Sequence, residues 1–206
     1  MVLTFLDLTK VKAHLNKSST RTVDDDELSE SMEAVEAAII EAIGPVVSTA
    51  QDEWHDGGST IVRVDYRQIL TVTTVTESAG TYRRTLTEQP LDGSTFDAYG
   101  YTVDKGYGVI TRRVSGVAAP FMLGRRNVHV AYTAGFATVA ANVPKNIVMA
   151  GEELTRWLWE PQRGSGQQRG GSNSQPTIAN TLPAAGDAFP IRVEQLLRRY
   201  RSPGIG

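Results

Sequence analysis

The sequence of 206 residues contains no cysteine. Disulfide bonds, thiolate metal sites and cysteine nucleophiles are therefore excluded. Histidine is scarce too, since His14, His55 and His129 stand far apart and show no metal-ligand spacing. The acidic run at residues 24–27 lacks the pattern of a calcium-binding loop, and no nucleophile elbow, phosphate-binding loop or His–Glu helix motif occurs. We therefore predict no catalytic, metal-binding or cofactor-binding residues, and a protein that is not an enzyme.

Long apolar runs are also missing. No stretch approaches the length that crosses a bilayer. The amino-terminal segment MVLTFLDLTKVK has an aspartate inside its apolar part and no small-residue cleavage site. We therefore expect neither a membrane span nor a secretory signal, and a protein that stays in the cytoplasm or in something assembled there. The apolar content of 40% and charged content of 21% are typical of a globular protein with a sizeable core.

The net charge of −2 conceals an uneven distribution. Residues 1–160 carry 15 basic and 21 acidic side chains, a balance of −6, whereas residues 161–206 carry 6 basic and 2 acidic side chains, a balance of +4. We infer that the two parts face different partners.

Apolar side chains at helical spacing predict four helices, at about residues 4–15, 24–43, 144–160 and 189–201. The second is the clearest and ends at Gly44, before a proline. Its apolar stripe comprises Leu28, Met32, Val35, Ile39 and Ala42. The stripe of the third comprises Ile147, Ala150, Leu154, Trp157 and Leu158, with Trp159 expected at an interface. We expect the third helix to pack on the second.

Between about residues 46 and 133 the apolar period changes to two, and β-branched runs alternate with turns at residues 78–80 and 105–108. The sequence therefore predicts an α+β fold: a small helical bundle with an antiparallel, β-hairpin-rich middle. We divide the chain into a body at residues 1–160, a Gly/Ser/Gln-rich linker at 161–188, and a basic carboxy-terminal helix and tail at 189–206. The small residues of the segment 134–141 allow a strand and a helix start to pack closely.

Five short motifs follow one another in order from residue 4 to about residue 164. They are LT…VK.HL (3–15), DD…EAA…I…G (24–44), strands of the V…V.SV type, YTVD…GVI (101–110), and a closing run V.V.YTAG…VP..I..A…L..W (128–157). In this order they resemble the head–tail connector (adaptor) proteins of long-tailed double-stranded DNA bacteriophages.

The resemblance implies a structural virion protein that forms a twelve-membered ring below the portal, assembled in the host cytoplasm and located in the neck. Its partners would be copies of itself, the portal protein and a downstream stopper or tail protein. The ring would complete the head and extend the DNA channel, through which genomic DNA passes without specific binding. No membrane partner is implied.

Two surfaces are candidates for function. Helix 24–43 carries eight carboxylates and no basic residue. Its acidic face is either simply solvated or lines the DNA channel, where negative charge repels phosphates. The residues of this face are Asp26, Glu30, Glu33 and Glu41.

The carboxy-terminal helix is the second candidate surface, because it is too short to be stable alone in water. It either packs on the protein's own body or docks on the portal, with DNA as a third possible partner. The predicted portal-binding residues are Ile191, Arg192, Leu196, Leu197, Arg198, Arg199, Tyr200 and Arg201.

Other functions remain open at this point. A stopper or tail terminator would share the compartment, but we expect such a protein to be mostly β. A carbohydrate-binding β module would need exposed aromatic side chains clustered on the strands. An enzyme would need polar groups that converge in a pocket.

Overall fold

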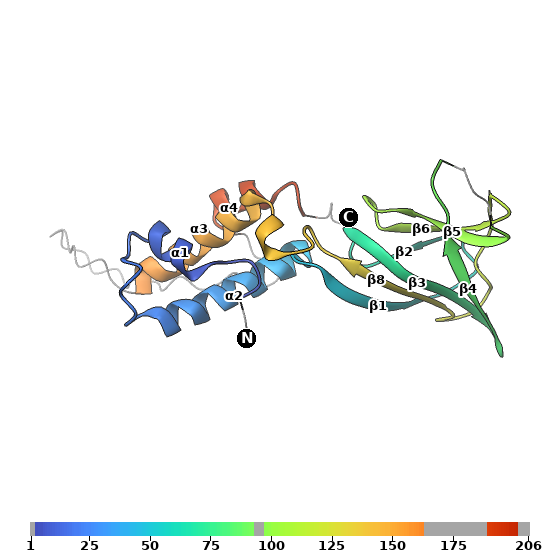
Figure 1. The fold of residues 1–206 in the computed structure, drawn as a ribbon, viewed down its shortest axis with the longest axis horizontal. Helices are drawn as coiled ribbons and strands as arrows, with labels where there is room; N and C mark the ends of the chain where they lie inside the picture. Colours follow the sequence, from blue (N-terminus) through green and yellow to red (C-terminus); the bar gives the residue numbers. More distant parts are fainter. Residues whose placement is uncertain (1–2, 93–96, 163–188, 202–206) are drawn as a thin grey trace, which may run out of the picture. The chain divides into compact units, whose positions relative to one another are not determined.

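The computed structural model describes residues 3–92, 97–162 and 189–201. They form two compact units (Figure 1): unit 1 contains the described residues up to Val46 and from Val139 onward, and unit 2 spans Val47–Thr138. Apart from residues 161 and 162, the predicted linker at 161–188 lies outside the described residues. No helix in the described ranges has the length and apolar character needed to cross a membrane.

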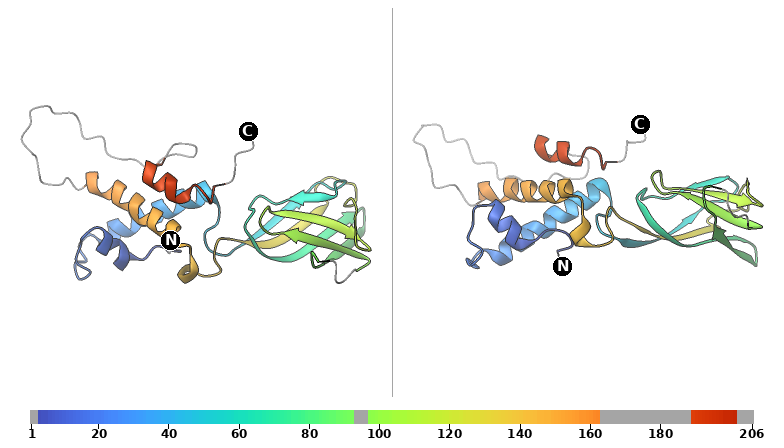
Figure 2. Two further views of the ribbon diagram at one scale, coloured as in Figure 1. Left: turned by 90° about the horizontal axis from the view of Figure 1, so that it is seen from above. Right: turned by 45° about the horizontal axis from the view of Figure 1, so that its top comes forward.

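Unit 1 contains the helices α1 (Leu8–His14), α2 (Asp25–Ile43), α3 (Lys145–Gln162) and α4 (Ile191–Leu197), and a short 3-10 turn at Ala140–Asn142. As predicted, α3 packs against α2, and it also packs against α4 (Figures 1 and 2). The α2 stripe is buried except for Ala42, which is half-buried, while Ile43 joins the core. In α3, Ile147, Ala150 and Leu154 are fully buried.

The prediction for the two tryptophans of α3, with Trp157 in the buried stripe and Trp159 at an interface, is wrong. Trp159 is 2% exposed and Trp157 is only half-buried. Lys17 places its ammonium group 5.0 Å from the centre of the Trp159 ring. The loop that follows α1 therefore helps to cover a side chain that periodicity alone placed outside the core.

Three helices differ from their predicted bounds. The first begins later than residue 4, because Asp7 caps it by accepting a hydrogen bond from Lys10 N at 3.0 Å. The third runs to Gln162 rather than residue 160, a difference common at helix ends. The fourth spans only seven residues of the predicted 189–201, since it begins after Pro190 and gives way to a turn in which Tyr200 N donates to Leu197 O.

The residues before α1 form a short strap without regular secondary structure, Thr4–Leu6, that is bound to α2 through Glu36. The Glu36 carboxylate is 4% exposed and accepts four hydrogen bonds, from Thr4 N, Thr4 Oγ1, Phe5 N and Leu6 N, at 2.7–2.8 Å. A buried carboxylate is stable when several donors surround it. Glu36 therefore fixes the chain's entry into unit 1.

Unit 2 is an eight-stranded sheet. Its strands are β1 (Thr49–His55), β2 (Ile61–Arg63), β3 (Ile69–Ala79), β4 (Tyr82–Glu88), β5 (Tyr99–Asp104), β6 (Val109–Val114), β7 (Val117–Ala118) and β8 (Val128–Ala134). The order is β1-β8-β3-β4-β5-β6-β2, with β7 paired to β6. All paired neighbours are antiparallel except β4 and β5, which are parallel. The α+β class is confirmed, and the expectation of a purely antiparallel middle is wrong at this one pairing.

The sheet curls so that its two ends share one core. Val62 and Ile110, from β2 and β6, are buried in the same cluster as Val75 and Val130, from β3 and β8 (Figure 1). The turns predicted at residues 78–80 and 105–108 lie between β3 and β4 and between β5 and β6. The edge strand β1 lies inside the predicted β region, but its mostly polar sequence, TAQDEWH, does not mark it as a strand, because none of its side chains is fully buried.

Gly135 follows β8 and lies directly against the chain that enters β1. A Cβ atom at this position would stand 2.9 Å from Val47 C and Ser48 N. Only a glycine fits here, and its neighbour is the chain that enters β1 rather than the helix start expected to pack against residues 134–141.

Candidate functional site

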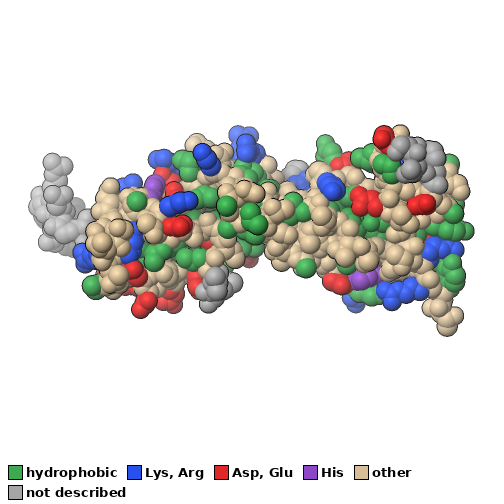
Figure 3. Space-filling view, viewed as in Figure 1, with side chains coloured by type: hydrophobic (Ala, Val, Ile, Leu, Met, Phe, Trp, Pro, Cys, Tyr) green, Lys and Arg blue, Asp and Glu red, His purple; other side chains and the backbone are tan. Residues whose placement is uncertain are grey.

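The acidic residues of α2 fall into two groups. Those at its start are used within unit 1: Asp24 lies 2.9 Å from Lys17 Nζ, and Asp25 pairs with Lys12. Asp26, Glu30 and Glu41 are exposed and form no ion pair with any other described residue, whereas Glu33 is half-buried. Figure 3 shows acidic side chains gathered along the α2 edge of unit 1. The predicted acidic face is thus solvent-accessible in the single chain.

The second candidate surface, on α4, is divided between an inner and an outer face. Leu197 is fully buried and Tyr200 is 7% exposed, so both pack within unit 1 together with Val193. Leu196 and Arg201 are half-buried. The exposed members of the predicted set are Ile191, at 77%, and Arg192, Arg198 and Arg199. With α4 in this position, only the outer face can meet a partner.

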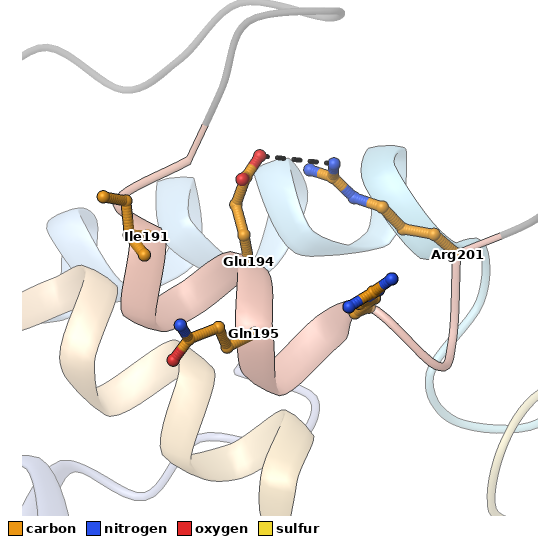
Figure 4. Close-up of a pocket in the computed structure, with 5 residues that line it drawn as sticks. Ile191, Glu194, Gln195 and Arg201 are labelled. Carbon is orange, nitrogen blue, oxygen red and sulfur yellow. Dashed lines mark hydrogen bonds and ion pairs between the residues drawn. The ribbon is translucent and has the colours of Figure 1, made fainter.

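A hollow of about 350 Å³ lies on this outer face and is lined by Ile191, Glu194, Gln195, Arg198 and Arg201 (Figure 4). Glu194 Oε1 and Arg201 Nη1 are 3.4 Å apart across it. Arg198 makes no ion pair with the residues that the structure describes. The hollow therefore offers an apolar side chain and a guanidinium that no described carboxylate pairs with, a combination suited to a segment with one apolar and one acidic side chain.

Arg192 of α4 and Arg199, which follows the helix, are partly engaged. Arg192 lies 3.0 Å from Glu153 of α3, and the Arg199 guanidinium lies 4.6 Å from the centre of the Tyr200 ring. Glu153, Glu194 and Gln195 were not predicted as part of this surface. The sequence carried no signal for Glu153, because its position beside α4 follows from tertiary packing alone.

The three histidines do not come together at one site. His14, His55 and His129 each lie beside a single carboxylate, at 3.8, 2.9 and 2.7 Å. Within the described ranges no three His, Asp or Glu side chains are placed to hold a metal ion. Burial raises the pKa of Tyr101 to about 12, with a smaller contribution from Glu88, so this tyrosine is neutral at physiological pH.

Exposed aromatic side chains occur on the strands, but their ring faces are partly occupied. The Arg84 guanidinium lies 3.4 Å from the centre of the Tyr99 ring and 5.1 Å from that of Tyr82. Trp54 stacks on His129 with ring centres 4.6 Å apart. A sugar-binding platform needs open ring faces, so this arrangement does not favour a carbohydrate-binding module.

No protein-family model matches this chain. No curated protein matches it in sequence either. Solved structures are similar, however. A chain from the neck of an empty GTA particle, computed with C6 symmetry, is 18% identical with a TM-score of 0.57, and the match covers 98% of this chain and 91% of that chain.

Two further structures are also similar. A chain from the virion of a native gene transfer agent (GTA) particle is 16% identical with a TM-score of 0.57, over 98% of this chain and 91% of that one. A chain from the neck of a native GTA particle, computed with C12 symmetry, is 16% identical with a TM-score of 0.52, over 96% and 89%. The resemblance to neck proteins is thereby confirmed at the level of the fold.

Proposed function

We propose that this chain is a structural protein of a virion neck. The observation that carries the proposal is the shared fold, which extends over 98% of this chain and 91% of a chain from the neck of a GTA particle. A likeness of this extent includes both the helical unit and the sheet unit, so it does not rest on a common small motif.

Within the neck, the chain would act as the adaptor: a ring that joins the portal to the stopper or tail proteins, completes the head and extends the DNA channel. Helices at both ends of the chain support this role over that of a stopper or tail terminator, which we expect to be mostly β. A ring of twelve copies is in keeping with the C12 symmetry with which one similar neck was computed. The role is structural and requires no catalysis.

Two surfaces would serve this role. The outer face of α4, with Ile191 and Arg198 beside its hollow, would dock on the portal through apolar contact and ion pairs with acidic residues. The exposed carboxylates of α2, among them Glu30 and Glu41, would face the channel and repel DNA phosphates.

The proposal can be tested by removing the chain from particle assembly. Cells that produce the particles without this protein should accumulate heads and tails that are complete but unjoined, as seen by electron microscopy of lysates. Supplying the protein in trans should restore joined particles. Joined, DNA-filled particles in its absence would contradict the proposed role.

A further inference from the structure

One end of the unit 2 sheet brings together arginines from two segments far apart in the sequence. Ser78 near the end of β3 and Asn127 before β8 are bound to each other, since Ser78 N donates to Asn127 O and Asn127 Nδ2 donates to Ser78 O, both at 2.9 Å. Arg83 pairs with Ser78 across the β3–β4 turn, and Arg126 precedes Asn127. Arg83, Arg125 and Arg126, with the nearby Leu123, are called the arginine end below.

The loop that carries Leu123, Arg125 and Arg126 is held in place by several hydrogen bonds. Asn127 Oδ1 accepts from Gly57 N at 2.9 Å, and Asn127 Nδ2 also donates to Met122 O at 2.8 Å. Arg126 N donates to Asp56 Oδ1 at 2.6 Å. Arg126 itself has a φ of 46°, in the left-handed region that is unfavourable for residues other than glycine. Such backbone strain persists where the surroundings enforce it and is concentrated at functional sites.

No described carboxylate neutralises the charges of the arginine end by an ion pair. All three guanidinium groups belong to exposed residues and form no ion pair with the described residues. The nearby Asp56 carboxylate accepts the backbone N–H of Arg126. Leu123 is 86% exposed, and Tyr82 beside Arg83 is 49% exposed. Figure 3 shows basic side chains next to hydrophobic ones toward this end of the sheet.

We propose that the arginine end binds an acidic protein surface, with Leu123 entering an apolar hollow and the three arginines pairing with carboxylates around it. Arginine and aromatic residues without lysine are typical of the centre of protein interfaces. Charge complementarity sets the sign of the partner, because two arginines on the loop before β8 and one on β4, none of them paired with a described residue, are satisfied by carboxylates. A nucleic-acid backbone would supply anions but no apolar contact for Leu123. The inference rests on the proposed function in one respect: a neck adaptor that joins the portal to the tail must also bind a protein other than the portal.

Binding can be measured with the full-length chain and three fluorescent probes at low salt. The first is a helical peptide with leucines on one face and glutamates on the other, the second is the same peptide with glutamines, and the third is a short DNA duplex. The acidic peptide should bind about tenfold more tightly than the glutamine peptide. Arg125→Glu with Arg126→Glu, and separately Leu123→Ser, should each weaken its binding about tenfold. Arg63→Glu, at an exposed arginine of β2, should leave it unchanged.

Arg126→Gly separates binding from folding. It removes the charge and relieves the left-handed strain, so the melting temperature should stay the same or rise while peptide binding weakens. Unchanged peptide binding by the Arg125→Glu, Arg126→Glu variant would overturn the inference. A second pair of results would also overturn the inference: the DNA duplex binds more tightly than the acidic peptide, and Leu123→Ser does not change peptide binding. Ring formation, scored by microscopy on the same samples, reports on the proposed function independently of these results.

Discussion

Glu36 shows how one buried side chain positions a whole segment. Its carboxylate accepts all four hydrogen bonds of the strap Thr4–Leu6. In Glu36→Gln, an NH₂ group would replace one of the carboxylate oxygens. This NH₂ group donates hydrogen bonds, so it could not accept those that the strap's N–H and hydroxyl groups donate. We expect a loss of about 3 kcal/mol in unfolding free energy, since hydrogen bonds to charged groups are strong and unpaired buried donors are costly.

Chemical denaturation of the monomeric protein would measure this loss, with Glu30→Gln, an exposed position on the same helix, as the control. Equal stability of the two variants would show that the strap does not depend on Glu36.

At the scale of residues, periodicity in the sequence predicted which apolar side chains are buried, but it could not predict which polar side chains are buried and which are exposed. The α2 stripe from Leu28 to Ile39 follows from periodicity. Glu36 and Glu30 are chemically identical in the sequence, yet one is buried by the strap and the other faces solvent. The burial of Trp159 rather than Trp157 likewise depends on the loop at Lys17, and the apolar periodicity of the helix cannot predict a contact with that loop.

At the scale of elements, α3 is the centre of unit 1, because it packs on α1, α2 and α4. Leu154 on this helix is fully buried, and Leu154→Ala should cost about 2–5 kcal/mol by removing buried contacts and leaving a cavity. Met149→Ala, at a position on the same helix that is 42% exposed, should cost much less.

Thermal unfolding should be followed on monomeric protein, because ring assembly would add stability of its own. A melting temperature unaffected by Leu154→Ala would contradict the central position of α3.

The outer face of α4 can be tested without disturbing its inner face. Ile191→Ser combined with Arg198→Glu changes two exposed residues of the hollow and leaves the buried Val193 and Leu197 in place. We expect an unchanged melting temperature and about tenfold weaker capture of the protein by purified portal.

Lys10→Glu, an exposed charge reversal on α1, is the matched control for portal capture and should retain it. If the α4 variant joined the portal as tightly as the unmodified chain, the outer face of α4 would not be the docking surface.

Helices were predictable as elements because their apolar stripes are long, whereas two features of the sheet were not. The edge strand β1 has no fully buried residue, and its mostly polar sequence, TAQDEWH, shows no alternation of apolar and polar residues. The parallel pairing of β4 with β5 depends on a connection that no turn motif specifies. For the candidate site, the arginines in and after α4 were predictable from composition. Which face of α4 is buried was not, because this depends on where α3 packs against it.

At the scale of the whole molecule, the acidic face of α2 predicts how DNA behaves in the assembled particle. Glu30→Lys with Glu41→Lys would replace two exposed carboxylates by cations. If the face lines the channel, each new cation in contact with a phosphate adds affinity through counterion release, so DNA ejection should slow.

Ejection from particles that carry this variant can be timed by the release of dye-accessible DNA. Glu88→Lys, an exposed charge reversal on β4, is the control. Ejection at the normal rate from intact variant particles would assign the α2 face to solvent or to a neighbouring subunit.

The central claim is that copies of this chain form the ring between portal and tail. Negative-stain electron microscopy of the purified protein, alone and mixed with portal, tests this most directly. The account predicts rings with a central opening that stack coaxially on the portal, because a neck adaptor must continue the DNA channel. Particles that remain single chains both alone and with portal would contradict it.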